Sequence, residues 1–400
     1  MGETFQTQAI EMKLLYITSK PAYPTVDGGC FAIQRFLDAL LLGNHEITYL
    51  TFETYKHPFD QKAWPEEIIQ AIDLHSVFID TKIRPFPLLT KTIWGHSYHI
   101  SRFRTPNLSL KISQLLKSNQ FDAIVLDGLY SSACLDDIRL QSQAKIYLRT
   151  HNVEHEIWDA LAKNSKSKGK SFIIRMLSQT LKKDEITLLN QVNGIFSISS
   201  EDTNKFMTLG IKTPIVEIPV SIDIAEPTES TVTNAFFFIG GMDWAPNKEA
   251  VNLLISTIFP AIKSKLPDAE LHIAGAGTDQ IKAGNGIKCH GFIADSMAFM
   301  RKSGTLLLPL KSGSGVRIKI LEAMSVGAPI VTTSIGKEGI NALDCMSIAD
   351  TTDAFITASI VLQDNCELKE KYARNSRTYI QANYSPTIIS TALNEILHER

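Results

Sequence analysis

The sequence predicts an α/β fold of two domains, each a parallel β-sheet with helices on both faces. Short apolar runs alternate with helical stretches along the chain, and the order of strand, glycine turn and helix occurs near the start and again after residue 234. Such alternation is typical of doubly wound sheets, because parallel strands need crossover connections. The 400 residues are also enough for two domains of ordinary size, each with its own core.

The first half of the chain shows this pattern from residue 13 onward. An apolar run at 13–18 is followed by a loop with two adjacent glycines, and a helix is predicted from about 31 to 42. Further short strands are predicted at 47–51, 123–126, 146–149 and 194–199. Because the carboxyl ends of parallel strands meet at one edge of a sheet, we expect the residues that follow these strands to face one ligand site. They are Gly28, Gly29, Asp127, Thr150 and His151.

The second half repeats the pattern after a polar segment at 225–234, which is the best candidate for a linker. Strands are then predicted at 235–239, 270–274, 286–290 and 305–308, with a helix at about 247–262 and final helices at about 368–382 and 386–398. No short sequence repeat is evident, so we interpret the halves as two similar folds. The run GAGTDQ resembles half of a dinucleotide fingerprint, but Gln280 replaces the third glycine and NAD binding is not expected.

The stretch 308–339 carries the clearest indication of a ligand site. A buried strand leads through a Gly/Ser turn at 312–315 into a helix with Arg317, Lys319 and Glu322 in its first two turns. Amides at a helix start and two cations favour a bound anion, and the glycines let it approach the main chain. A carboxylate beside a phosphate suits the hydroxyls of a ribose, so the stretch predicts a nucleotide site. An ordinary strand-loop-helix unit with surface cations would give the same pattern.

Composition sets the outer limits of the function. The formal net charge is −2, so the overall balance favours neither nucleic acid nor a strongly acidic partner. Five widely spaced cysteines without a C-x-x-C pair indicate neither a disulfide framework nor a zinc site. The first eleven residues lack the pattern of a signal peptide, and no uncharged run is long enough to span a membrane. We therefore expect a cytoplasmic protein, with peripheral membrane contact as a possibility.

Two segments carry cations beside apolar side chains. Residues 84–103 interleave aromatics and cations without one period, which fits either an acceptor or lipid site or a pair of helices packed into the domain. Residues 163–183 hold seven Lys and Arg, no acid, and apolar residues at helical spacing. That pattern is typical of a helix on an anionic membrane surface, and equally of an amphipathic helix packed on its own domain.

Taken together, the ordered motifs resemble the family-four glycosyltransferases, which are retaining enzymes of GT-B architecture with two facing Rossmann-like domains and a cleft between them. The resemblance covers nearly the whole chain, and its last motif is the most specific. The motifs are the Gly28–Gly29 loop, RTHNVEHE at 149–156, FSISSEDTNKF at 196–206, IPVSID at 218–223, FIGGMDWAPNKEAV at 238–251, HIAGAG at 272–277, CHGFIADSMAFM at 289–300 and GSGVRIKILEAMSVGAPIV at 313–331.

The resemblance implies an N-terminal acceptor domain at 1–224, joined by the C-terminal helix 385–400, and a C-terminal nucleotide-sugar-binding domain at 225–384. It implies that Glu322 holds the ribose and that His151 lies near the donor sugar. The implied catalytic residues are His151, Arg317 and Lys319, and the implied donor-binding residues are Gly28, Gly29, Gly241, Phe292, Ile293, Gly313, Ser314, Gly315, Val316 and Glu322.

Three departures from the family pattern bear on the mechanism. Ser314 stands where the first glutamate of the E-x7-E motif belongs, and Gly241 and Pro246 replace an Arg and a Lys after the first strand of the second domain. Arg317 and Lys319 are then the expected counter-charges for the diphosphate. Val220 and Ser221 replace the usual Asn-Gly of the hinge segment, which bears on the hinge and not on the fold.

The family resemblance implies transfer of a sugar from a nucleoside diphosphate sugar to a glycan or lipid-linked acceptor, typically in surface polysaccharide or glycoconjugate synthesis, without cofactor, metal or nucleic acid. Two alternatives stay open: a sugar-nucleotide 2-epimerase, and a sugar-nucleotide-binding protein without transfer activity. The first needs acid/base residues that the sequence does not reveal. The second is motivated by Ser314. The donor base, the donor sugar and the acceptor are not predicted.

Overall fold

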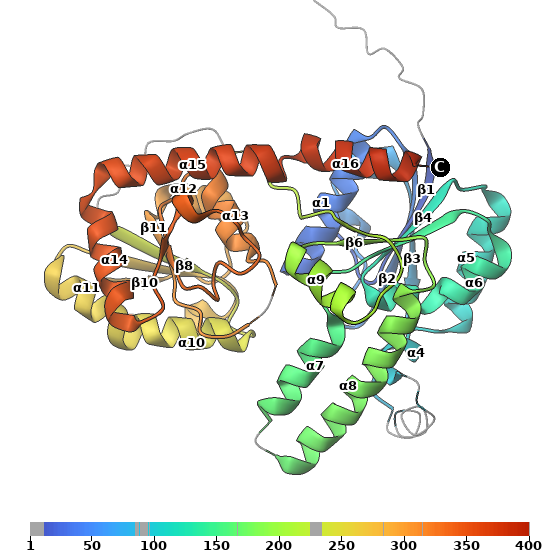
Figure 1. The fold of residues 1–400 in the computed structure, drawn as a ribbon, viewed down its shortest axis with the longest axis horizontal. Helices are drawn as coiled ribbons and strands as arrows, with labels where there is room; N and C mark the ends of the chain where they lie inside the picture. The colour runs from blue at the N-terminus through green and yellow to red at the C-terminus, as the bar shows by residue number, and fades with distance from the viewer. Residues whose placement is uncertain are drawn as a thin grey trace, which may run out of the picture. The chain divides into compact units, whose positions relative to one another are not determined.

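The computed structural model describes residues 12–84, 88, 95, 97–165, 167–224, 234–282, 284–313 and 315–399. The chain divides into two compact units (Figure 1). Unit 1 comprises Met1–Ser221 with Ile389–Arg400, and unit 2 comprises Ile222–Ile388. The last helix of the chain thus belongs largely to the unit that the N-terminal half builds.

Unit 1 is built on a seven-stranded parallel sheet with the strand order β3-β2-β1-β4-β5-β6-β7. The strands are β1 Lys13–Thr18, β2 Glu46–Glu53, β3 Ile72–Phe78, β4 Ala123–Asp127, β5 Lys145–Arg149, β6 Gly194–Ser197 and β7 Ile215–Glu217. The helices are α1 Gly28–Leu42, α2 Glu66–Ala71, α4 Tyr98–Ser101, α5 Pro106–Ser118, α6 Leu135–Gln141, α7 Glu154–Lys163, α8 Lys168–Leu189, α9 Ser200–Thr208 and α16 Pro386–His398, with short 3-10 turns η1 Gln61–Ala63 and η2 Leu129–Cys134.

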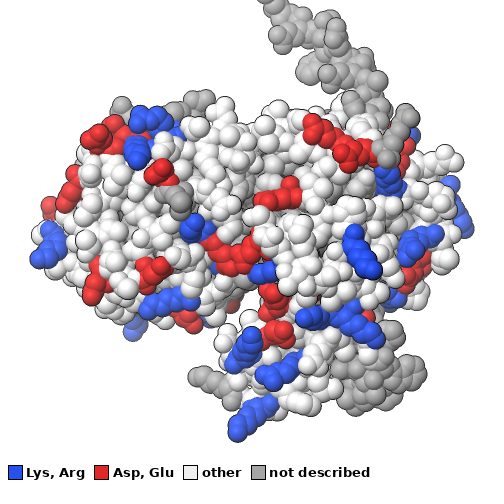
Figure 2. Space-filling model, in the orientation of Figure 1, with Lys and Arg blue, Asp and Glu red and all other residues white. Residues whose placement is uncertain are grey.

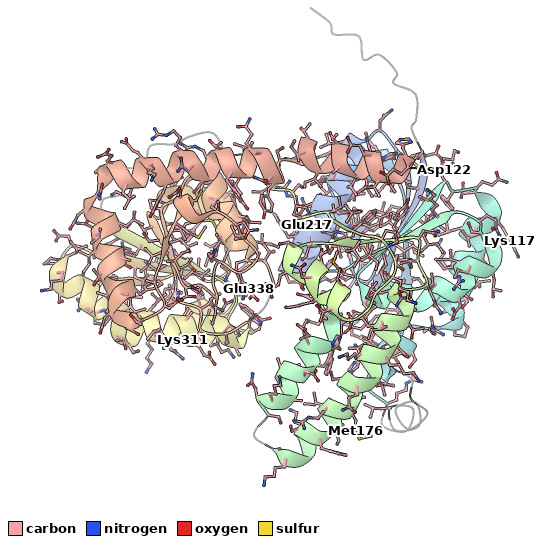
Figure 3. All side chains as sticks on the ribbon, in the orientation of Figure 1. Lys117, Asp122, Met176, Glu217, Lys311 and Glu338 are labelled. Carbon is pink, nitrogen blue, oxygen red and sulfur yellow. The ribbon has the colours of Figure 1, made fainter. Side chains whose placement is uncertain are left out.

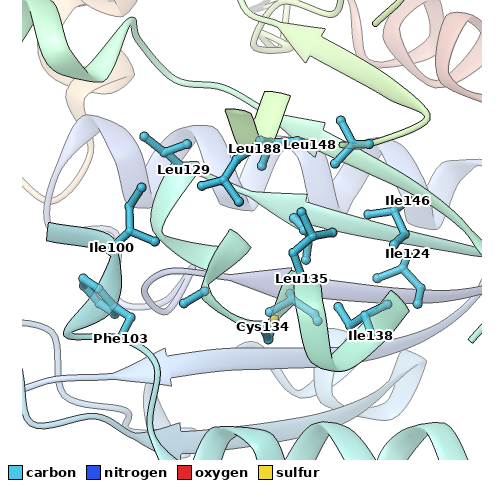
Figure 4. Packing of buried hydrophobic residues seen from close by; sticks show 14 of the residues in the cluster. Ile100, Phe103, Ile124, Leu129, Cys134, Leu135, Ile138, Ile146, Leu148 and Leu188 are labelled. Atoms are coloured by element: carbon cyan, nitrogen blue, oxygen red, sulfur yellow. The ribbon is translucent and has the colours of Figure 1, made fainter. Parts of the chain in front are cut away.

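The side chains of each central strand point alternately into two cores, one on either face of this sheet. Leu14 and Tyr16 pack with α1 and with Ile389, Leu393 and Leu397 of α16. Residues of the opposite parity, such as those of β4 and β5 drawn in Figure 4, pack with α6 and α8. Continuous burial on both faces explains why these strands read as unbroken apolar runs in the sequence.

Unit 2 repeats the architecture with a six-stranded parallel sheet in the order β10-β9-β8-β11-β12-β13. The strands are β8 Ala235–Ile239, β9 Glu270–Ala274, β10 Ile287–Cys289, β11 Thr305–Leu308, β12 Ile330–Thr332 and β13 Ser347–Ile348. The helices are α10 Ala245–Leu253, the π-turn η3 Leu254–Ile258, α11 Phe259–Lys265, α12 Ser296–Lys302, α13 Ile318–Ser325, α14 Thr352–Asp364 and α15 Cys366–Tyr384, with 3-10 turns η4 Thr278–Gln280 and η5 Leu343–Cys345.

Several expected elements differ in extent from the structure. The helix expected from residue 31 begins at Gly28, because Asp27 caps it by accepting a hydrogen bond from the Cys30 amide. The helix expected to include Arg317 begins at Ile318, which leaves Arg317 at the N-cap in an extended conformation. Within residues 84–103, which fit an acceptor or lipid site or a pair of helices, the described part contains the short helix α4, and residues 85–87, 89–94 and 96 lie outside the described residues. The edge strand β3, before this stretch, was not predicted.

Candidate functional site

Each sheet changes the direction of its strand order at one point, and several of the predicted residues follow the strands there. In unit 1 the change lies between β1 and β4, and in unit 2 it lies between β8 and β11. Ligands of doubly wound sheets bind at the carboxyl ends of the strands at such switch points. Each unit therefore presents one candidate site.

In unit 1 a pocket of 480 Å³ lies at this switch point. Gly28 and Gly29, two of the residues predicted to bind the donor, and the predicted catalytic His151 line it. Its walls include Ser19, Lys20, Asp27, Gly28, Gly29, His57, Arg102, Gly128, Tyr130, His151 and Glu154. Their convergence follows from the parallel register of β1, β4 and β5, which brings the three strand ends to one edge.

A buried charge network holds His151 at the wall of this pocket. Asp127, the last residue of β4, is fully buried and accepts hydrogen bonds from the Tyr16 hydroxyl and from Arg149 Nη1, the latter at 3.0 Å from Oδ2. His151 Nε2 contacts Asp127 Oδ1 and lies 3.2 Å from Arg149 Nη1. Burial alone would raise the pKa of Asp127, but the charges of Arg149 and His151 outweigh it and lower that pKa to about 2. The carboxylate thus stays ionised and fixes the orientation of the imidazole.

Gly28 and Gly29 form the first turn of α1 and not a loop. A Cβ on Gly29 would lie 2.5 Å from Lys20 Nζ, so a side chain there would displace this lysine. Lys20 is held by Asp27 at 2.5 Å, and His57 Nε2 lies 3.3 Å from the other Asp27 oxygen. Burial opposes ionisation of Asp27, yet hydrogen bonds from His57 and Lys20 hold its pKa well below the ordinary value. The Cys30 amide already donates a hydrogen bond to Asp27, so the start of α1 is partly capped and has one amide fewer to offer a ligand.

Glu154 is a pocket residue that the sequence reasoning missed, although it lies inside the RTHNVEHE motif. Its Oε2 accepts a hydrogen bond from the Tyr130 hydroxyl at 3.0 Å, and its backbone amide donates to Glu185 Oε1 at 2.9 Å. Burial and the nearby Glu185 charge raise the pKa of Glu154 to about 7. Near neutral pH a carboxyl group with this pKa can accept a hydrogen bond from a hydroxyl when ionised and donate one to it when protonated.

In unit 2, Lys319 and Gly241 are brought together through Asn247, which the sequence reasoning did not single out. Lys319 Nζ lies 3.0 Å from Asn247 Oδ1, and Asn247 Nδ2 donates to the Gly241 carbonyl at 2.9 Å. Desolvation, reinforced by the charge of Arg317 and partly opposed by Glu322, lowers the pKa of Lys319 to about 7. A Cβ on Gly240 would lie 2.6 Å from Lys319 Nζ, so the glycine after β8 makes room for the amine.

Arg317 lies against the glycine turn that follows β11. Its Nη1 donates to the Gly315 carbonyl, its Nη2 lies 3.7 Å from Glu338 Oε2, and its guanidinium packs over the Trp244 ring at 5.5 Å. Gly313 has φ of 113°, and a Cβ there would lie 3.0 Å from Arg317 Nη2. This backbone needs glycine, and it places the turn directly on the cation. The loops after β8 and β11 thus surround one cationic centre.

The remaining predicted donor residues of unit 2 are Phe292, Ile293, Ser314, Val316 and Glu322. Glu322 of α13 accepts a hydrogen bond from the Ser296 hydroxyl at 2.7 Å, which ties it to the segment containing Phe292 and Ile293. Phe292 is 64% exposed, Ile293 is half-buried, and Val316 is half-buried beside Arg317. Ser314 lies outside the described residues. The hydrogen bond from Ser296 shows that the Glu322 carboxylate can accept a hydrogen bond from a hydroxyl group, as a residue that binds a ribose must.

The described residues include no group of three or more His, Cys, Asp or Glu side chains arranged to hold a metal ion. They also include no helix that is long and apolar enough to cross a membrane.

The two parallel-sheet α/β units have the fold of GT-B glycosyltransferase structures. Residues 233–365, most of unit 2, match the family model described as "Glycosyl transferases group 1". A Klebsiella pneumoniae protein described as an uncharacterized 44.6 kDa protein in the cps region is 24% identical over 409 residues, covering 96% of this chain and 99% of its own length.

Solved structures of low sequence identity share the fold. Anabaena Alr3699/HepE in complex with UDP-glucose superposes with a TM-score of 0.64 at 14% identity, over 97% of this chain and 100% of that one. A variant of S. aureus TarM in complex with fondaparinux, α-GlcNAc-glycerol and UDP gives a TM-score of 0.66 at 13% identity, over 97% and 100% of the two chains. The likeness thus extends through both units.

Proposed function

We propose that the protein is a retaining glycosyltransferase that moves a sugar from a nucleoside diphosphate sugar to a glycan or lipid-linked acceptor without a metal ion. Unit 2 binds the donor and unit 1 binds the acceptor. The observation that carries the proposal is the cationic centre of unit 2, where Arg317 and Lys319 meet the glycine-rich ends of two neighbouring strands. The complexes of HepE with UDP-glucose and of TarM with UDP support the choice of donor class.

The proposed chemistry assigns the diphosphate charge to the protein's cations. As the bond between the anomeric carbon and the diphosphate oxygen breaks, Arg317 and Lys319 stabilise the departing negative charge. The acceptor oxygen forms the new bond on the same face of the sugar, and its proton passes to a phosphate oxygen of the leaving group. His151 orients the donor sugar, while Glu322 and the 292–293 segment hold the ribose and base.

Thermal unfolding in the presence of UDP-, GDP-, ADP- and dTDP-sugars tests the donor assignment, since a ligand of the folded state raises the unfolding temperature. One nucleotide sugar should stabilise the protein, and Glu322→Ala and Lys319→Ala should each abolish the shift. Undiminished donor affinity of both variants in calorimetry would contradict these roles. Full activity in the presence of EDTA is expected.

Incubation of the selected donor without acceptor separates the proposed transferase from its alternatives. Slow release of the nucleoside diphosphate supports transfer, interconversion of the sugar indicates an epimerase, and binding without turnover indicates a binding protein. His151→Ala should lower the turnover at least about tenfold while the donor affinity changes little, because its role is realised at the reacting sugar. His75→Ala, on the edge strand β3, is the matched control.

Synthesis of a surface polysaccharide or glycoconjugate on the cytoplasmic side of the membrane is the proposed setting. The curated relative from the cps region supports this setting. Loss of the corresponding polymer on deletion of the gene, and its return with the wild-type but not the Lys319→Ala protein, is the expected result.

A further inference from the structure

The α7–α8 hairpin of unit 1 carries a strongly one-sided charge. Helices α7 and α8 pack against one another and extend from the sheet as a hairpin, and Lys and Arg cluster over its distal part (Figures 1 and 2). Residues 161–183 hold seven cations and no Asp or Glu, in a chain whose net charge is −2. The cations are Lys163, Lys166, Lys168, Lys170, Arg175, Lys182 and Lys183.

Six of these cations lie in the described part of the chain, and no carboxylate there neutralises them. Among the residues that the structure describes, which exclude Lys166, none of them forms an ion pair with a carboxylate. The side chains of Lys168, Lys170, Arg175, Lys182 and Lys183 are exposed. Their charge is therefore available to a partner.

Large apolar side chains are exposed among the same cations. Phe172 is 65% exposed, Ile173 is 51% exposed, and Leu161 on the facing helix is 50% exposed. Leu177 and Leu181, by contrast, are buried, and Leu181 belongs to a core cluster of unit 1. Helix geometry at 3.6 residues per turn places Phe172 roughly 140–180° from this buried line. We call the side of α8 that carries Phe172 the outer face. It is exposed, in contrast to the buried side with Leu177 and Leu181.

Cations surround Phe172 on this outer face. At about 100° per residue, Lys168, Arg175 and Lys183 lie within about 60° of Phe172 around the axis of α8. Met176, labelled in Figure 3, is half-buried at about 40° from Phe172 on the same helix. An apolar centre with a basic border is the pattern of a helix that lies in a membrane interface. Nucleic acid would account for the cations but leave the aliphatic Leu161 and Ile173 without a role.

We propose that the distal α7–α8 hairpin, residues 161–183, docks unit 1 onto a bilayer surface that contains anionic phospholipid. The Lys and Arg side chains bind the headgroup phosphates. Phe172, Ile173 and Leu161 enter the boundary between headgroups and acyl chains. This contact is peripheral and independent of sugar transfer, so it can be tested on the full-length protein without knowing the donor or the acceptor.

Sedimentation with vesicles tests the proposal. The protein should bind vesicles of phosphatidylcholine with phosphatidylglycerol and not vesicles of phosphatidylcholine alone, and raised salt should weaken the binding. The triple variant Lys168→Glu, Lys170→Glu, Arg175→Glu should bind at least about tenfold more weakly. The matched control reverses three exposed lysines of unit 2, Lys265, Lys282 and Lys302, and should bind like wild type.

The apolar contribution has its own variant. Phe172→Ser should weaken vesicle binding several-fold, whereas Leu140→Ser, at an 84% exposed position on α6, should not. Unchanged thermal unfolding of all variants shows that the fold is kept. Equal binding to both kinds of vesicle, or triple and Phe172 variants that bind like wild type, would overturn the proposal. So would binding of a DNA duplex more tightly than the anionic vesicles with the same loss in the triple variant, which would assign the hairpin to nucleic acid.

Discussion

Asp127 and Arg149 form a fully buried ion pair at the carboxyl ends of two neighbouring strands, with Oδ2 and Nη1 3.0 Å apart. The register of β4 and β5 places the two residues directly opposite one another. Arg149 Nε and Nη2 are buried without a hydrogen-bond partner among the described residues, and its guanidinium packs over the Phe36 ring. The charge of Arg149 is therefore compensated chiefly through Asp127, and both residues contact His151.

Asp127→Asn should therefore destabilise the protein strongly. The substitution leaves the Arg149 charge buried without its counter-ion, and removal of one partner of a buried pair typically costs about 3–5 kcal/mol. The free energy of unfolding in urea measures the effect. The exposed pair of Asp80 and Arg84 has the same 3.0 Å separation, so Asp80→Asn is the matched control and should cost far less, because solvent screens an exposed pair. Equal losses in the two variants would contradict the importance of burial.

Lys319 should make donor binding depend on pH. Its lowered pKa of about 7 means that the amine of the free protein loses its charge above neutral pH. Because a diphosphate favours the ammonium form, binding must take up a proton there, and the affinity for the selected nucleoside diphosphate should fall as the pH rises above about 7. Calorimetry in two buffers of different ionisation enthalpy measures this uptake.

Lys319→Arg provides the control for this pH dependence. The guanidinium keeps its charge at all these pH values, so the variant should bind without proton uptake between about pH 6 and about pH 9. This range extends roughly one to two units on either side of the Lys319 pKa. An identical pH dependence in wild type and variant would assign the proton to another group.

Gly240→Ala should weaken donor binding with little effect on the fold. The added Cβ would lie 2.6 Å from both Lys319 Nζ and Asn247 Nδ2, so the two side chains must separate or shift. We expect roughly a tenfold loss of donor affinity, about the 1.4 kcal/mol of one charge-assisted hydrogen bond. Gly284→Ala is the control, because nothing lies within 4 Å of a Cβ at that position. A Gly240 variant with wild-type affinity would show that the donor does not use Lys319 in this position.

Glu154 should reduce the stability of unit 1 as the pH rises. The fold raises its pKa from 4.5 to about 7, so the folded state binds more protons than the unfolded state between these values. Stability from this group is complete below about pH 4.5 and is lost as the pH rises through about 7. Glu154→Gln should therefore gain stability relative to wild type across this window and keep a constant difference above it. Urea unfolding at several pH values checks this, with Glu46→Gln on the surface of β2 as the control.

Local patterns were enough to predict the doubly wound units. The runs at 13–18 and 235–239 coincide with β1 and β8 because strands buried on both faces are continuously apolar. The edge strand β3, IDLHSVF, has polar residues on a partly exposed face. It is therefore not a continuous apolar run, and the same pattern does not predict it. The predicted start of α1 lies three residues after the observed one, although Asp27 before the glycines is a helix-capping signal.

The candidate sites divide in the same way. His151 and Lys319 follow strand ends or glycine turns and could be singled out locally. Their partners could not, since Asn247 is 72 residues from Lys319 and Asp127 is 24 residues from His151. Such contacts depend on which strands become neighbours and in which register, and a single sequence does not contain that information. The role of Glu154 depends on the residues that surround it in the pocket, and the sequence alone does not reveal them.

The last helix has a consequence for how the molecule is made. Ile389, Leu393 and Leu397 of α16 pack in the same core as α1, so the unit whose strands leave the ribosome first lacks part of its apolar core until α16 emerges. During synthesis the second unit can mature earlier than the first. A stop codon just before residue 386 would spare the sheet of unit 2 but leave the core of unit 1 without α16, and would so expose the first-made part of the chain to proteolysis.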